Sequence, residues 1–91
     1  MVRAAIIGLG RWGRSLVNAV QGKSRDIQFA AAYTRTHAAA EEFCREKQIP
    51  LRDRYADILS DETIDAVVLA TPHSQHIAQV TQAAAAGKHI H

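Results

Sequence analysis

The chain has 91 residues, 47% of them hydrophobic, with one cysteine and a formal net charge of +2. This length allows at most one small domain, and an alternating strand-helix chain of this size completes about four or five strands, fewer than a full dinucleotide-binding fold. The arginines are dispersed, which argues against a nucleic-acid footprint or a basic membrane helix. Because Cys44 has no disulfide partner and no long apolar or signal-like segment is present, the composition predicts a cytoplasmic protein.

The first predicted element is a buried parallel strand at residues 3–7, a short apolar run that a glycine ends. A helix should follow from about residue 11 to residue 21, since Gly22 stands where a C-terminal cap belongs. Its apolar stripe is predicted to contain Trp12, Leu16, Val17 and Val20. Two interpretations of Trp12 stay open: packing within this stripe, or contact with the edge of a bound cofactor.

Between these two elements lies a G-x-G-x-x-G turn, Gly8-Leu9-Gly10-Arg11-Trp12-Gly13. The first glycine permits a sharp turn, the second lets a pyrophosphate approach the backbone, and the third lets the helix pack close to the strand. The helix N-terminus presents unpaired N–H groups and a positive dipole end, and Arg11 and Arg14 add positive charge nearby. We therefore expect residues 8–13 to bind the pyrophosphate of a dinucleotide, with a tight turn that binds nothing as the alternative.

The second strand is predicted at residues 28–33, and a helix at residues 37–47, capped by Thr36 and stopped before Pro50. The inward face of that helix is assigned to Ala39, Ala40, Phe43 and Cys44. Cys44 is thus interpreted as a small buried hydrophobe. Residues 51–54 predict a short third strand at or near a sheet edge, and residues 55–59 a single helical turn that contains Tyr55, Ile58 and Leu59.

Residues 64–70 are the most plainly buried run and predict a strand that Thr71 and Pro72 end. A helix is expected over residues 74–86, with Gly87 as its C-terminal glycine. Its inward-facing residues are predicted to be Ile77, Val80 and Ala84.

Alternating strands and helices with short connections require parallel strands and right-handed crossovers. The predicted fold class is α/β, a doubly wound Rossmann-type sheet of strand order 3-2-1-4-5, whose fifth strand begins at Lys88 and is incomplete. A cofactor crevice then lies beyond the C-terminal ends of strands one and four, where residues 8–13 and 71–76 face each other.

The end of the second strand indicates which nicotinamide cofactor binds. An NAD site usually has an acidic residue there, about twenty residues past the glycine turn, to bind the adenosine ribose. This chain has Thr34, Arg35 and Thr36 instead, and their hydroxyl and guanidinium groups suit a 2′-phosphate. NADP is the predicted cofactor, with NAD as the alternative. If these residues bind no phosphate, Thr36 is simply a helix cap and Arg35 faces the solvent.

His73 and His76 are three residues apart and so able to share one face of the first helical turn after the fourth predicted strand. A metal site is not predicted, because neither further ligands nor a Cys-x-x-Cys pair lie nearby. Packing and hydrogen bonding around the nicotinamide pocket is the favoured role, with a base or a substrate contact as the alternative.

Three ordered motifs connect the chain to a known family: AIIGLGRWG at residues 5–13, IDAV at residues 64–67 leading to ATPHSQH at residues 70–76, and AGKH at residues 86–89. On these, the whole chain resembles the N-terminal domain of the Gfo/Idh/MocA oxidoreductases, the glucose-fructose oxidoreductase and inositol dehydrogenase family. The resemblance implies that residues 8–13 hold the pyrophosphate, Thr34 and Arg35 the adenosine side, and His76 the nicotinamide loop. That loop would comprise Ala70, Thr71, Pro72 and His73.

Family members continue into a Glu-Lys-Pro motif with a catalytic lysine, and then into a larger α+β domain that binds substrate and often builds a homo-oligomer. By this resemblance residues 1–91 are an N-terminal dinucleotide-binding fragment without a catalytic residue, inactive alone, in which Lys88 is an ordinary lysine. The parent enzyme is expected to transfer hydride between NADP and a sugar, polyol or related hydroxy or carbonyl compound. The alternative is a dinucleotide-sensing regulatory module; nucleic acid and membrane are not expected partners, and the Thr34-Arg35 pair argues against S-adenosylmethionine.

Overall fold

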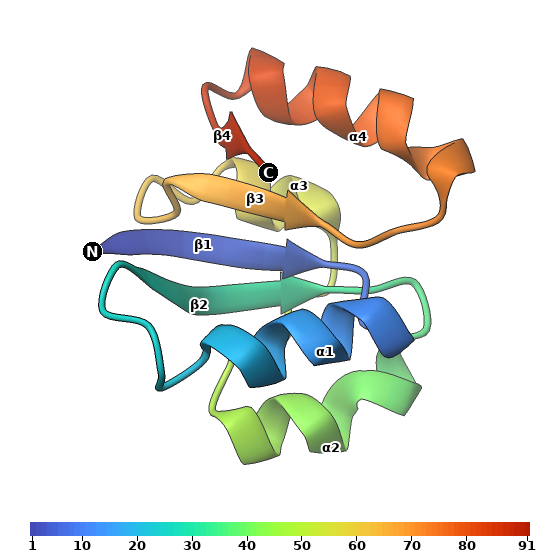
Figure 1. Ribbon diagram of the computed structural model, residues 1–91. Helices are drawn as coiled ribbons and strands as arrows, with labels where there is room; N and C mark the ends of the chain where they lie inside the picture. The colour runs from blue at the N-terminus through green and yellow to red at the C-terminus, as the bar shows by residue number, and fades with distance from the viewer.

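The computed structural model describes residues 1–91 except for the side chain of His73. Strands and helices alternate along the chain in the order β1 (Val2–Ile7), α1 (Arg11–Val20), β2 (Ile27–Tyr33), α2 (His37–Lys47), α3 (Tyr55–Leu59), β3 (Ala66–Leu69), α4 (His73–Ala85) and β4 (His89–Ile90). The strands form one parallel sheet of order β2-β1-β3-β4 (Figure 1). This arrangement confirms the predicted α/β class and is a partial Rossmann fold.

The central strand β1 supplies both layers of the core, because successive side chains of a strand point to opposite faces. Ala4 and Ile6 lie in a buried cluster with side chains of α1 and α2, such as Val17. Ala5 and Ile7 lie in a second cluster with side chains of α3 and α4. Figure 1 shows α1 and α2 together on one side, with α4 on the other. Both faces of the sheet are therefore covered, as a parallel sheet requires.

The predicted third strand is wrong as a strand. Only Leu51 bridges β2, through Ala32, whose N–H donates to the Pro50 carbonyl at 2.9 Å. The Arg52 N–H still donates to the Ala32 carbonyl at 2.8 Å, but the pairing ends there, and the Arg52 and Arg54 side chains form ion pairs with Asp61 and Asp57. The bridge does lie at the predicted edge, outside β2, so the predicted order holds for the other four strands. The strand predicted at residues 64–70 is shorter, Ala66–Leu69.

The inward face of α4 was also predicted wrongly. Ile77 is 80% exposed and Val80 39% exposed, whereas Gln79 and Ala83 face the sheet. Ala84 is exposed as well. Hydropathy favoured the apolar residues, but the buried Gln79 side chain accepts a hydrogen bond from the Thr71 hydroxyl through Oε1, which offsets part of the cost of its burial.

Smaller differences concern α1 and α2. Trp12 is 64% exposed and does not join the apolar stripe of α1, and Ala39 is exposed rather than inward. Thr36 occupies the N-cap position of α2 without a side-chain capping hydrogen bond. Cys44 is buried as predicted, and burial raises the pKa of its thiol, an effect that the nearby Arg14 guanidinium partly offsets. None of the described helices is long and apolar enough to cross a membrane.

Candidate functional site

A cavity of about 490 Å³ opens at the carboxyl ends of the strands, where the loops after β1, β2 and β3 meet. We call it the carboxyl-end cavity. The residues that line it are Gly8, Leu9, Gly10, Arg11, Trp12, Tyr33, Thr34, Arg35, Thr36, Ala70, Thr71, Pro72 and Gln75. In Figure 1 this is the end to which the strand arrows of β1, β2 and β3 point.

The loop after β1 is the glycine turn, and two of its glycines are required by the packing of the chain itself. Gly8 has φ +96°, and a Cβ there would lie 2.9 Å from the Ala70 carbonyl oxygen. A Cβ on Gly13 would collide with the Gly8 carbonyl. The turn therefore lies directly against the loop after β3, and α1 lies directly against the turn, as the sequence predicted.

Gly10 differs from these two glycines, because a Cβ there would meet nothing within 4 Å. Gly10 is also one of the residues that line the carboxyl-end cavity. α1 begins directly after Gly10 with no side-chain cap and no acidic residue in its first turn. The N–H groups of that turn, with the positive end of the helix dipole, are thus available to an anion in the cavity.

The loop after β2 supplies the second wall. The backbone N–H of Gly8 donates to the Tyr33 carbonyl at 2.7 Å, and the N–H of Leu9 donates to Thr34 Oγ1 at 3.3 Å. Thr34 thereby fixes the glycine turn while its own hydroxyl hydrogen remains a donor. Arg35 is exposed beside it. None of the described residues that line the cavity is acidic.

The loop after β3 supplies the third wall, and hydrogen bonds to β1 and α4 hold it in place. The N–H of Ala70 donates to the Ile7 carbonyl at 2.8 Å, and the Thr71 hydroxyl donates to Gln79 Oε1 at 2.5 Å. Gln79 is only 9% exposed, and its backbone carbonyl accepts a hydrogen bond from the Tyr55 hydroxyl at 2.9 Å. Burial raises the pKa of Tyr55, so this hydroxyl stays protonated as a donor. Gln79 thus anchors the cavity wall to α3.

Most of the predicted binding residues come together in this cavity. The exceptions are Gly13, which is buried beneath the turn, and His76, which is half-buried on α4 and does not line the cavity. The side chain of His73 lies outside the described residues. Sequence reasoning missed Tyr33 and Gln75, although their positions at the last residue of β2 and in the first turn of α4 are signals for this edge. Cofactor binding by these residues stays a prediction.

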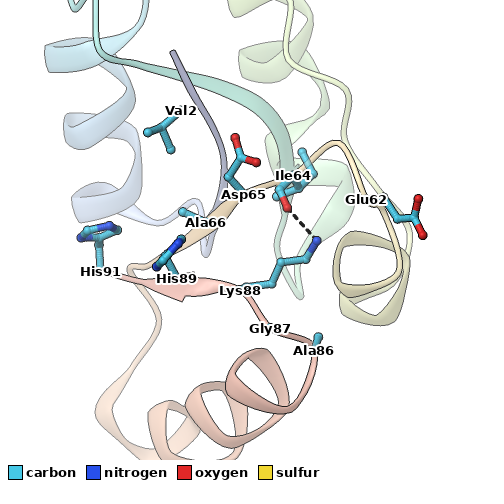
Figure 2. A pocket seen from close by; sticks show the side chains of 10 residues that line it. All are labelled: Val2, Glu62, Ile64, Asp65, Ala66, Ala86, Gly87, Lys88, His89 and His91. Carbon is cyan, nitrogen blue, oxygen red and sulfur yellow. Dashed lines mark hydrogen bonds between the residues drawn. The ribbon is translucent and has the colours of Figure 1, made fainter.

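A second cavity, of about 620 Å³, lies at the amino ends of the strands and is larger. We call it the amino-end cavity; Figure 2 shows the side chains that line it, among them Lys88, Asp65 and His89. Lys88 Nζ donates to the Asp61 and Ile64 carbonyls, both at 2.6 Å, so this lysine has a structural role that the sequence did not indicate. Among the described residues no three His, Cys, Asp or Glu side chains are grouped to hold a metal ion.

Comparison with known proteins identifies the family of the chain. The sequence profile of the Gfo/Idh/MocA oxidoreductase family, described as an NAD-binding Rossmann fold, matches residues 2–91. The chain belongs to this family. The resemblance predicted from the three sequence motifs is thereby confirmed.

Individual Gfo/Idh/MocA relatives differ in the cofactor that their names state. Over 93 residues the chain is 37% identical to scyllo-inositol 2-dehydrogenase (NAD(+)) of Bacillus subtilis, covering 98% of this chain and 26% of that protein. It superposes with TM-score 0.89 and 26% identity on scyllo-inositol dehydrogenase of Lactobacillus casei with bound NAD(H) and scyllo-inositol, covering 99% of this chain and 27% of the other. The score is 0.90, at 30% identity, for a proposed NADPH-dependent oxidoreductase of Desulfitobacterium hafniense, with coverage of 98% and 25%. The chain thus spans about a quarter of the length of these relatives.

Proposed function

We propose that this Gfo/Idh/MocA domain binds NADP in preference to NAD. The observation that carries the proposal is the second wall of the carboxyl-end cavity, where Thr34, Arg35 and Thr36 lie beside the glycine turn and no described lining residue is acidic. A guanidinium and two hydroxyls are donors for a 2′-phosphate, and the carboxylate that would repel this phosphate is missing from the described lining. Relatives include proteins named for each of the two cofactors, so family membership alone leaves the choice open.

In this proposal a dinucleotide lies along the lining of the carboxyl-end cavity. The pyrophosphate would lie over Gly10, where the chain leaves open space at the uncapped start of α1. The adenosine half would lie along residues 34–36, and the nicotinamide half along residues 70–72. Trp12 lines the cavity and is 64% exposed, and in this proposal its ring covers part of the bound cofactor.

The parent enzyme is proposed to be an oxidoreductase that acts on a sugar, polyol or related hydroxy or carbonyl compound. When bound, the nicotinamide supplies the hydride chemistry, and this chain contributes binding and orientation. The proton-transferring group, the substrate contacts and any homo-oligomer interface are proposed to belong to a second domain. The 91-residue chain alone should therefore bind cofactor without turnover, in a cytoplasmic setting.

A titration of the chain with NADPH and with NADH tests the cofactor preference, followed by nicotinamide fluorescence and by quenching of Trp12. We expect tighter binding of NADPH. Arg35→Ala should raise the Kd for NADPH about tenfold to a hundredfold, the value of a hydrogen bond to a charged group, and leave the Kd for NADH unchanged. Arg25→Ala, an exposed arginine outside the cavity, is the matched control.

Two other outcomes would count against the proposal. Equal affinities of the wild-type chain for NADPH and NADH would overturn the NADP preference while keeping the dinucleotide site. Binding of neither cofactor by a folded chain would show that the isolated domain is not an autonomous cofactor-binding unit.

A further inference from the structure

Arg14 lies one helical turn after the start of α1, but it does not line the carboxyl-end cavity. Its side chain turns instead into the seam between α1 and α2. Nε donates to the Leu9 carbonyl at 3.0 Å, and Nη2 donates to the Ala39 carbonyl in the first turn of α2 at 2.8 Å. The guanidinium also lies over the Phe43 ring, 5.1 Å from its centroid. The positive charge predicted to assist the cofactor is thus used within the protein.

These contacts complete the restraint of one peptide in the glycine turn. The Leu9 N–H is held by Thr34 Oγ1 at the end of β2, and the Leu9 carbonyl is held by Arg14. The Leu9 side chain is 4% exposed in the core beneath. The middle of the turn is therefore fixed to the loop after β2 through Thr34 and to α2 through Arg14.

We propose that Arg14 is a positioning residue that fixes the glycine turn against α2, so that the turn is already in its binding conformation when the cofactor arrives. The inference rests on the proposed function, in that the turn must bind the pyrophosphate for the positioning to affect affinity. A binding loop that is ordered in advance loses less entropy on binding. The planar guanidinium serves this role because two of its N–H groups and its face reach three partners at once.

Positioning and charge predict different behaviour of conservative variants. Arg14→Lys keeps the charge but loses the planar fork, whereas Arg14→Met keeps only the apolar stem. If Arg14 acts by geometry, both variants should weaken NADPH and NADH to a similar degree, by about tenfold, because the pyrophosphate is common to both cofactors. Arg11, which does line the cavity, is the matched control: Arg11→Lys should bind better than Arg11→Met, since a lysine can still supply charge.

Amide hydrogen exchange of the cofactor-free chain gives a readout that does not depend on the proposed function. In Arg14→Lys the Leu9 N–H should exchange about tenfold faster than in the wild type, while amides of β1 should be unchanged. A merely structural role would lower the Tm and leave the Kd of the folded protein unaltered, so the titrations are made well below the Tm. If Arg14→Met does not fold, Arg14→Lys alone carries the test.

The outcomes separate the two proposals. Wild-type affinity of Arg14→Lys, or unchanged exchange of its Leu9 N–H, would overturn the positioning role. A third outcome is that the wild-type chain binds neither cofactor while exchange of the Leu9 N–H still rises in Arg14→Lys. In that case Arg14 does fix the glycine turn, but its proposed effect on cofactor affinity is overturned and the proposed function fails.

Discussion

The two cavities at opposite ends of the strands are comparable in volume, about 490 Å³ and 620 Å³, but the chain uses their polar groups differently. At the amino end, Lys88 is bound by two carbonyls, and the Asp65 carboxylate accepts the Arg3 N–H at 3.0 Å. At the carboxyl end, α1 starts without a side-chain cap, and Arg35 is exposed. The proposed binding site is the smaller of the two cavities; it lies at the carboxyl ends of the parallel strands, where such sheets bind their ligands.

The largest expected effect comes from adding a methyl group at one of two glycines of the turn, Gly10 or Gly13. Gly13→Ala should lower the free energy of unfolding by about 3 kcal/mol and abolish cofactor binding, because the new Cβ collides with the Gly8 carbonyl. Gly10→Ala should cost about 1 kcal/mol or less at this N-cap position, yet raise the Kd for NADPH at least about tenfold, since its Cβ enters the space assigned to the pyrophosphate.

Urea unfolding and NADPH titration of both variants check this pair. Gly13→Ala should mainly lower the free energy of unfolding, and Gly10→Ala should mainly raise the Kd for NADPH. Undiminished NADPH affinity in Gly10→Ala would remove the distinction between the two cavities.

A smaller effect is expected at the amino-end cavity. Lys88→Met should lower the free energy of unfolding by about 2 kcal/mol, because the Asp61 and Ile64 carbonyls lose a charged donor. The Kd for NADPH should stay at its wild-type value. Thermal and urea unfolding measure the first quantity and fluorescence titration the second, with Lys23→Met at an exposed position as the control. A rise in Kd equal to that of Gly10→Ala would indicate that the amino end takes part in binding.

The smallest effect is a pH dependence at Asp61, beside the same cavity. Hydrogen bonds from the Thr63 hydroxyl and backbone N–H lower the pKa of this carboxyl, and Arg52 lowers it further, against an opposing effect of burial. Because the folded pKa lies below the unfolded value of about 3.9, the carboxylate stabilises the fold at neutral pH, and this contribution is lost as pH falls through the folded pKa.

Asp61→Asn should therefore be less stable than the wild type by about 1 kcal/mol or less at pH 7, with the difference shrinking below about pH 3.9. Urea titrations at pH 7, 5 and 3 measure it, and Asp26→Asn, on an exposed side chain, is the matched control. A difference that grows on acidification would mean that the sign is wrong.

The glycine turn and the elements around it could be predicted because local chemistry determines them. The run at residues 4–7 is apolar without interruption, Gly8 ends it, and α1 must follow closely to bring Gly13 against the turn. The position of residues 34–36 beside the cavity was predicted from their separation from that turn along the sequence, about twenty residues. The other signals lie within a few residues of the structure that they predict.

The face of α4 could not be predicted in this way. Helical periodicity predicts that Ile77 and Val80 face the core, but Gln79 is buried instead. Its side-chain Oε1 accepts a hydrogen bond from Thr71, and its backbone carbonyl accepts one from Tyr55. Tyr55 is 24 residues from Gln79 along the chain, and Thr71 lies eight residues away in the loop before α4, so helical periodicity indicates neither contact. The role of Arg14 was missed for the same reason, since its acceptor Ala39 belongs to another helix.

The position of β1 at the centre of the sheet has a consequence for synthesis. Along the chain, Val2–Ile7 precedes both of its partners, Ile27–Tyr33 on one side and Ala66–Leu69 on the other. At about 5–20 residues per second, the interval between the emergence of these two partners lasts a few seconds. Throughout it, the most deeply buried strand of the finished protein is a nascent edge with free backbone groups.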